Sequence, residues 1–207
     1  MMIDMKTTPR SYTMRTRAEQ VGRTRDRILD AVIDLVAERP LAACTLPAIA
    51  DRADVSVQTI LRAFVSRDGL FEAALERGSA QVLAERRADP DDVDGSLESL
   101  IDHYEKLGDG VVLLLGQESW EPFAAQVTTN GRRLHRVWVE SVFARSLEAA
   151  PRAAREQLVD LLVVATDVYA WKLLRRDRGL SRNQTAERVR RLVASVCESA
   201  RNPAGRT

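Results

Sequence analysis

Residues 45–70 decide how this chain folds, and they read Thr-Leu-Pro-Ala-Ile-Ala-Asp-Arg-Ala-Asp-Val-Ser-Val-Gln-Thr-Ile-Leu-Arg-Ala-Phe-Val-Ser-Arg-Asp-Gly-Leu. Thr45, Ser56 and Ser66 each stand where a hydroxyl can cap the first backbone N–H groups of a helix. Pro47 falls in a first helical turn, where its missing N–H costs nothing. The stretch therefore predicts two short helices joined by a turn at residues 54–56, followed by the start of a third helix.

The second short helix has the pattern of a helix that rests on a core and presents its outer face. Four apolar residues are expected to face inward: Val57, Ile60, Leu61 and Phe64. This leaves Gln58, Thr59 and Arg62 pointing outward. A short helix that offers such side chains fits the major groove of DNA, where Gln suits adenine and Arg suits guanine. A solvated helix face with no ligand is the alternative.

This stretch and its surroundings resemble the tetracycline-repressor-like (TetR) family of bacterial transcription regulators. The matching segments are the amphipathic helix with Ile28, Leu29, Val32, Ile33, Leu35 and Val36, residues 45–50, 53–56, 59–60 and 64–70, and a C-terminal stretch at 167–180. Four positions depart from the family pattern: Asp54 stands where glycine is usual, Gln58 where glycine or alanine is frequent, Leu61 where tyrosine is common, and Arg67 where lysine is usual. Leu61 removes a hydroxyl that would contact phosphate.

The resemblance implies an all-α fold, with an N-terminal three-helix DNA-binding domain containing the helix-turn-helix and a C-terminal helical domain for ligand binding and dimerisation. The hydrophobic pattern agrees, because no strand-like alternation occurs in the chain. We expect a disordered basic arm over 1–20, a DNA-binding domain over 21–66 and the second domain over 67–203. The implied function is a homodimeric, ligand-responsive DNA-binding regulator, more often a repressor, that a small apolar molecule releases from double-stranded operator DNA.

The charge of the chain is unevenly distributed, although its net value is only +1. Between Lys6 and Arg27 there are seven basic and two acidic residues, whereas residues 28–207 hold 24 basic and 27 acidic residues. A basic segment on a near-neutral body suits a protein that meets phosphate at one end. A merely solubilising arm fits equally well. The predicted DNA contacts are Arg25, Thr45, Ser56, Val57, Gln58, Thr59, Arg62 and Arg67.

Two C-terminal segments are apolar on more than one side. We expect one long helix over 152–177 and another over 183–200, each with one face for the chain's own core and one for a second subunit. The resemblance implies a four-helix bundle between two subunits, whereas an entirely internal helix is the alternative. The predicted interface residues are Leu158, Leu162, Ala165, Tyr169, Val189 and Val193.

The middle of the chain is where we expect a small molecule to bind. A helix is expected to open near Ser96 and to end at Gly108-Asp109-Gly110, and another covers about 129–148. Aromatic and polar residues gather in this region, as they do in pockets between helices. The predicted ligand contacts are His103, Tyr104, Gln117, Trp120, Phe123, His135 and Trp138. Ordinary core packing is the alternative for each of them.

Several classes of protein find no support in the sequence. No run of about 18 apolar residues could span a membrane, and no secretory signal is recognisable, so a cytoplasmic location is expected. No catalytic motif and no metal-ligand spacing occur, so we expect neither an enzyme nor a cofactor or metal. Cys44 and Cys197 are expected to be reduced thiols. The alternative function is a helical small-molecule-binding or protein-interaction module without operator binding.

Overall fold

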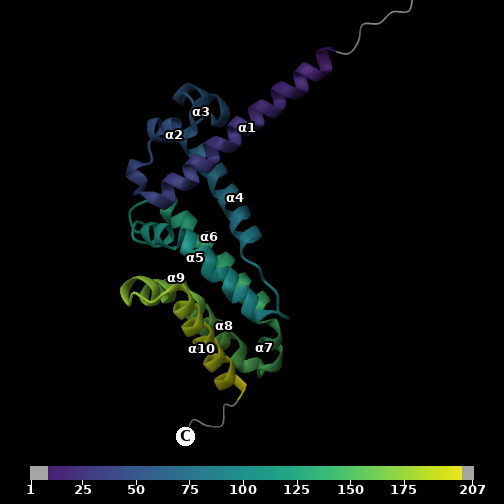
Figure 1. Ribbon diagram of the computed structural model, residues 1–207, viewed down its shortest axis with the longest axis vertical. Helices are drawn as coiled ribbons and strands as arrows, with labels where there is room; N and C mark the ends of the chain where they lie inside the picture. Colours follow the sequence, from purple (N-terminus) through teal and green to yellow (C-terminus); the bar gives the residue numbers. More distant parts are fainter. Residues whose placement is uncertain (1–8, 202–207) are drawn as a thin grey trace, which may run out of the picture. The chain divides into compact units, whose positions relative to one another are not determined.

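The computed structural model describes residues 9–201, with side chains over 19–200, and within that range every regular element is a helix. The all-α prediction is therefore confirmed. In chain order the elements, labelled in Figure 1, are α1 (Pro9–Glu38), η1 (Leu41–Ala43), α2 (Leu46–Ala53), α3 (Val57–Phe64), α4 (Arg67–Glu85), α5 (Val93–Leu115), α6 (Pro122–Val142), α7 (Ala144–Ala149), η2 (Arg152–Ala154), α8 (Arg155–Thr166), α9 (Val168–Lys172), η3 (Leu173–Asp177) and α10 (Arg182–Arg201). No described helix is long and apolar enough to cross a membrane.

The chain forms two compact units. The first contains Met1–Leu35 and Ala42–Arg77, and the second contains Val36–Leu41 and Gly78–Thr207. Helices α1 and α4 each contribute to both units, so the division differs from the boundary that we expected between residues 66 and 67. Helix α1 begins at Pro9, inside the segment expected to be a disordered arm, and residues 1–8 lie outside the described residues.

The first unit packs the apolar faces of α1 to α4 around a small core that includes Ile28, Ile49, Ile60, Leu70 and Phe71. Arg77 of α4 joins this core to α1 by a fork of charge-assisted hydrogen bonds. Its Nε donates to Asp30 Oδ1 at 2.7 Å, its Nη2 donates to Asp30 Oδ2 at 3.0 Å, and its Nη1 reaches Asp26. Such a bidentate pair fixes the orientation of the guanidinium as well as its distance.

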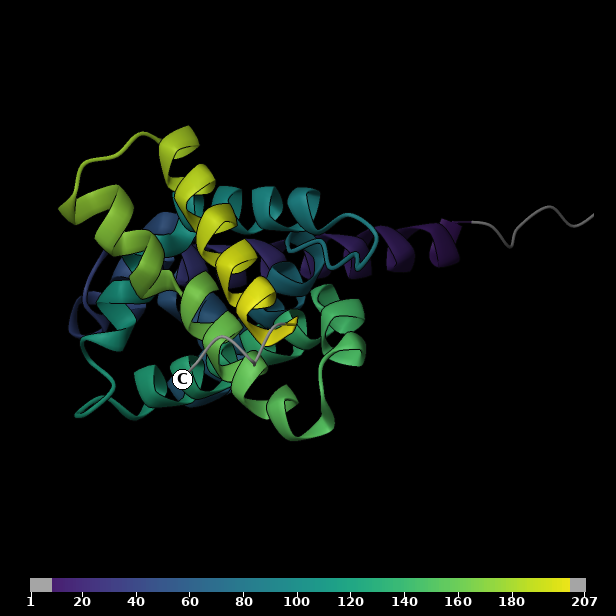
Figure 2. The same ribbon diagram turned by 90° about the horizontal axis from the view of Figure 1, so that it is seen from below.

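The second unit has the larger core. Helix α5 packs against α6, α9 and α10, while α8 packs against α6 and α10, and Figure 2 shows the yellow α10 lying along the green α8. The fully buried side chains at its centre include Leu100, Ile101, Phe143, Leu162 and Trp171.

Helix α5 runs unbroken through Gly108 and Gly110, so our expectation that these glycines end the helix is wrong. Both residues allow close packing. A Cβ atom on Gly108 would lie 2.5 Å from Trp171 Cζ3, and one on Gly110 would lie 2.6 Å from Ala37 Cα. The glycines are therefore needed because neighbouring groups occupy the space of a side chain.

The expected single helix over 152–177 is also wrong, because the chain is extended at Asp167 (φ −68°, ψ 154°) between α8 and α9. The Asp167 carboxylate accepts a hydrogen bond from the backbone N–H of Tyr169 at 2.8 Å and so starts α9. The chain then continues into η3, which is a π-helical turn.

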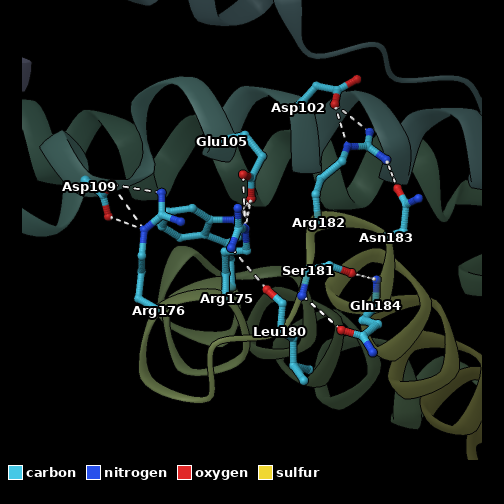
Figure 3. A network of polar contacts seen from close by, with 11 residues as sticks. Asp102, Glu105, Asp109, Arg175, Arg176, Leu180, Ser181, Arg182, Asn183 and Gln184 are labelled. Atoms are coloured by element: carbon cyan, nitrogen blue, oxygen red, sulfur yellow. Dashed lines mark hydrogen bonds and ion pairs between the residues drawn. The ribbon is translucent and has the colours of Figure 1, made fainter.

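A row of ion pairs attaches this region to α5 (Figure 3). Glu105 accepts hydrogen bonds from Arg175 Nε at 2.9 Å and from Trp171 Nε1 at 3.0 Å. Asp109 pairs with Arg176, and Asp102 pairs with Arg182 at the start of α10. Three carboxylates on successive turns of one helix thus hold η3 and the first turn of α10.

Most of the residues predicted for a subunit interface are already used inside the chain. Five of the six are buried in the core of the second unit: Leu158, Leu162, Ala165, Val189 and Val193. Their assignment to a partner-facing surface is wrong, since the side chains point inward; only Tyr169 is exposed. The exposed apolar residues of α8 and α10 are instead Leu161, Val164 and Leu192, of which Val164 is 68% exposed.

Candidate functional site

Helices α2 and α3 begin at the caps that the sequence predicted. Thr45 Oγ1 accepts a hydrogen bond from the N–H of Ala48 at 3.3 Å, and Ser56 Oγ accepts one from the N–H of Thr59 at 3.1 Å. The Thr59 hydroxyl lies 2.9 Å from Ser56 Oγ, which ties it to the cap. These bonds satisfy N–H groups that would otherwise have no partner within the helix.

The turn between the two helices depends on Asp54. Its backbone is left-handed (φ 51°, ψ 55°), and its N–H reaches the carbonyl groups of Ala50 and Asp51. Val55 then donates to the Ala50 carbonyl at 3.0 Å, which closes α2. Aspartate tolerates this conformation better than most residues, and this explains how the turn forms without glycine.

The outer face of α3 is formed by Gln58, Leu61 and Arg62, and Val65 just after the helix continues it; all four residues are exposed. Ile60 and Phe64 form the buried side of this helix segment. Our expectation that Leu61 faces inward is wrong. Its position on the helix is rotated by about 100° from that of Ile60, and its side chain is 41% exposed. The face therefore combines an amide, a guanidinium and two aliphatic groups.

Val65 ends α3 in a strained conformation. Its φ is 65° and its ψ is −44°, and the N–H of Ser66 bonds to the carbonyl of Phe64 at 2.6 Å, so Val65 is the central residue of a γ-turn with positive φ. This conformation is rare, and a β-branched residue is poorly suited to it. The side chain is 88% exposed, so no packing in the described chain compensates for the strain.

Replacing Val65 with glycine is expected to stabilise the first unit. Relief of strain of about 1–3 kcal/mol exceeds the added flexibility of the unfolded chain, about 0.4–1 kcal/mol, so we expect a net gain of about 1 kcal/mol. Urea denaturation followed by circular dichroism measures the change. Val65→Ala is the matched control, because it removes the branched side chain and keeps most of the strain. Equal stability of the glycine and alanine variants would contradict this account.

Two arginines predicted to contact DNA make contacts within the first unit. Arg25 Nη1 donates to the Ala63 carbonyl at 2.8 Å, and its guanidinium lies 4.1 Å from the centroid of the Phe64 ring. A cation at this end of α3 satisfies a terminal carbonyl and complements the helix dipole. The Arg67 guanidinium lies 4.3 Å from the centroid of Phe71, at the start of α4. Sequence spacing gave no signal of the contact between Arg25 and Ala63.

Known proteins are similar to this chain over the region that contains α2 and α3. Residues 28–74 match the model of the bacterial regulatory proteins of the tetR family. This segment of the chain is therefore similar to the N-terminal domain of TetR-family regulators. Over 57 residues the chain is 42% identical to an uncharacterised HTH-type transcriptional regulator, YvkB, from Bacillus subtilis strain 168. That match spans 28% of this chain and 30% of the relative.

Solved structures extend the likeness of fold to most of the chain. A transcriptional regulator from Rhodococcus sp. Rha1 superposes with a TM-score of 0.65 and 18% identity, covering 86% of this chain and 97% of that one. A TetR-like transcriptional regulator from Rhodococcus sp. RHA1 gives 0.61 and 19%, covering 88% and 97%. At these identities the likeness concerns the fold.

In the second unit, the structure gathers four of the seven predicted ligand contacts. The Tyr104 hydroxyl donates to the Thr166 carbonyl at 3.1 Å, and His135 Nε2 lies 3.1 Å from Thr166 Oγ1. The rings of His135 and Trp138 are stacked with centroids 5.8 Å apart, and those of His103 and Tyr104 are 6.0 Å apart. We call His103, Tyr104, His135 and Trp138 the aromatic cluster.

The other three predicted contacts lie elsewhere. Gln117 Oε1 accepts a hydrogen bond from the N–H of Leu41 at 2.9 Å, so it serves a structural bond within the second unit. Trp120 is 66% exposed at the end of the segment after α5, and Phe123 is half-buried at the start of α6. Over the part of the chain that the structure describes, no three His, Cys, Asp or Glu side chains are grouped to hold a metal ion.

Arg86, which the sequence did not single out, faces the aromatic cluster from the end of α4. Its Nη1 lies 3.5 Å from His135 Nδ1, and its Cζ lies 5.2 Å from the centroid of Tyr104. Burial, reinforced by the charge of Arg86, lowers the pKa of both His103 and His135 to about 4. Burial also raises the pKa of Tyr104 to about 12. The imidazoles and the phenol are therefore neutral near pH 7.

Proposed function

We propose that this chain is a homodimeric, ligand-responsive transcriptional regulator of the TetR family that binds operator DNA through α3. The observation that carries the proposal is the outer face of α3, where Gln58 and Arg62 are exposed beside two capped helix starts. A helix presented in this way enters the major groove, and N–H groups at neighbouring helix starts meet phosphates.

The side chains of α3 suggest how a half-site is read. Arg62 suits the O6 and N7 acceptors of guanine, Gln58 suits adenine, and the aliphatic groups of Leu61 and Val65 suit the methyl group of thymine. Thr45, Ser56 and Arg67 remain our predicted phosphate contacts. Thr59 remains a predicted base contact, and Val57 remains a predicted DNA contact. In a dimer, the two half-sites would lie about 34 Å apart or a multiple of that distance.

A gel shift with DNA from upstream of the chain's own gene tests the function. Specific binding that weakens steeply with salt is expected, because phosphate contacts release counterions. A matched fragment with scrambled sequence serves as the control. Equal binding to both fragments, or no binding, would favour the alternative of a helical binding module without an operator.

Arg62 and Arg67 are expected to act differently on DNA. Arg62→Ala should weaken binding by about 1–3 kcal/mol and relax the preference at one position of each half-site. Arg67→Ala should weaken binding to all sequences alike and lower the salt slope by about 1. Affinity for a set of singly substituted operators, measured at several salt concentrations, distinguishes the two. The same sequence dependence in both variants would refute the assignment.

Substituting the exposed apolar residues of α8 is expected to break the dimer. Leu161→Glu combined with Val164→Glu would bury two charges without partners in an interface, at a cost of several kcal/mol. Light scattering should show a folded monomer, because both side chains are exposed within one chain. Leu83→Glu, on the exposed side of α4, should leave a dimer. A stable dimer of the double variant would place the interface elsewhere.

The proposed effector is a small, mostly apolar molecule that binds in the second unit and weakens operator binding. The aromatic cluster supports this by its composition, because it combines large apolar rings with few polar groups. Its four side chains are buried, so an effector would have to displace part of their packing. The coupling between the two sites would be about 1–3 kcal/mol, and operator DNA would weaken effector binding by the same factor. A repressor that the effector releases is the form of regulation we propose.

A further inference from the structure

Val65 combines a strained backbone with an unpacked side chain. Among the described residues, it and Asp54 are the two non-glycine residues with positive φ. Aspartate tolerates this conformation, whereas a β-branched residue is poorly suited to it. A glycine would form the same turn without strain. The turn that ends α3 therefore does not require the side chain of valine.

The side chain of Val65 also adds nothing to packing within the chain. It is 88% exposed, more than any other large apolar side chain among the described residues. Strained residues of this kind gather at sites where a protein contacts its ligand. Since no contact within the described chain offsets the strain, a contact with a partner is the remaining source of a compensating gain.

The position of Val65 relative to α3 indicates which partner this is. The N–H of Val65 donates to the Leu61 carbonyl at 2.9 Å, so the backbone follows the helix as far as this nitrogen. Gln58, Arg62 and Val65 are spaced by four and three residues and continue one exposed stripe. At 1.5 Å per residue, this stripe is about 10 Å long, or about three base-pair steps. An apolar group thus follows two polar groups that suit the edges of bases.

We propose that Val65 reads the 5-methyl group of a pyrimidine at the edge of each half-site. Thymine is distinguished in the major groove by its C5-methyl group, which apolar side chains contact. Cytosine methylated at C5 presents a methyl group at the same place. Phosphate is not a suitable partner, because the valine side chain has no hydrogen-bond donor. The assignment deepens the proposed reading of a half-site, so it rests on the proposed operator binding.

Removing single methyl groups from the DNA tests this contact with the full-length protein. Operators are first selected from random duplexes by the wild-type chain. Each thymine is then replaced by deoxyuridine, which lacks only the 5-methyl group. One such replacement should weaken binding about fourfold, the effect of one buried methyl group. The sensitive position should adjoin the one at which Arg62→Ala relaxes the preference, on the side away from the Gln58 contact.

The same position should respond to methylation of cytosine. With cytosine placed there, 5-methylcytosine should bind about fourfold more tightly than unmethylated cytosine, because it restores the methyl group alone. Val65→Ala should abolish both responses, since it removes the two γ-methyl groups. Leu61→Ala is the matched control on the same exposed face and should keep both responses.

Val65→Gly separates recognition from folding. It should raise the stability to urea, because it relieves the strained φ, and yet weaken binding to the thymine operator. A purely structural role of Val65 would instead move stability and affinity in the same direction. Circular dichroism of each variant verifies that the helices are retained.

Equal binding of thymine and deoxyuridine at every operator position would overturn the proposal, as would a methyl response that Val65→Ala retains. In both cases, specific binding by the wild-type chain would leave the proposed regulator intact. If the wild-type chain selects no sequence from the random duplexes, the proposed function fails, and the assignment of Val65 fails with it.

Discussion

Lowering the pH from 7 to 4.5 is expected to reduce the free energy of unfolding by about 2 kcal/mol for each of His103 and His135. Burial and the charge of Arg86 lower the pKa of both side chains to about 4 in the folded protein. In the unfolded chain each pKa is about 6.5, so the unfolded state binds more protons between these two values. Stability is therefore complete above pH 6.5, falls as the pH decreases toward 4, and levels off below 4.

Urea denaturation of the full chain at half-unit intervals of pH measures this loss. His135→Gln should be less stable at pH 7, since its bonds to Arg86 and Thr166 change, but its stability should depend less steeply on pH between 6.5 and 4. His103→Gln should behave in the same way. The prediction fails if both single variants keep the wild-type slope, because the protons would then be taken up elsewhere in the chain.

Replacing Gly108 with alanine is expected to destabilise the second unit by about 2 kcal/mol, although the same change in an open helix stabilises it. The new Cβ would lie 2.5, 2.7 and 2.9 Å from three atoms of the Trp171 ring. That ring is 1% exposed, and its Nε1 is bonded to Glu105, so it cannot move aside freely. Overpacking of this kind costs about 1–3 kcal/mol.

Gly131 provides the matched control, because it also lies inside a helix but has no atom within 4 Å of its ideal Cβ position. Gly131→Ala should stabilise the protein by up to about 1 kcal/mol through helix propensity. The opposite signs of the two changes, measured by urea denaturation, are the expected result. In a Trp171→Leu background, Gly108→Ala should become much less costly. Equal effects at Gly108 and Gly131 would contradict the packing argument.

The helix-turn-helix could be predicted because its signals are local. Thr45 and Ser56 lie within three residues of the N–H groups that they cap, and the buried positions of α3 follow from helical spacing. Leu61 was misplaced because an aliphatic residue beside the buried stripe was taken to extend it. Whether Leu61 is buried depends on the direction in which Ile60 and Phe64 face the core. The hydrophobicity of the residues does not determine that direction.

The second unit could be predicted less well because its features depend on contacts distant in sequence. Gly108 was expected to end a helix, since the sequence does not reveal that Trp171 fills the space beside it. Leu162 and Val193 were assigned to a partner because an apolar helix face has the same composition whether it meets its own core or another subunit. Arg86 was not predicted because its neighbours, His135 and Tyr104, are distant from it in sequence.

Because α1 contributes residues to both units, it limits where this chain can be joined to another protein in a chimera. A chimera made by joining residues 1–77 of this chain to another regulator would also transfer Val36–Leu41, which belong to the second unit. Ala37 requires a glycine opposite it, as at Gly110, and the N–H of Leu41 requires an acceptor such as Gln117. Functional exchange of the DNA-binding domain should therefore succeed only when this six-residue segment is inherited together with its own α5.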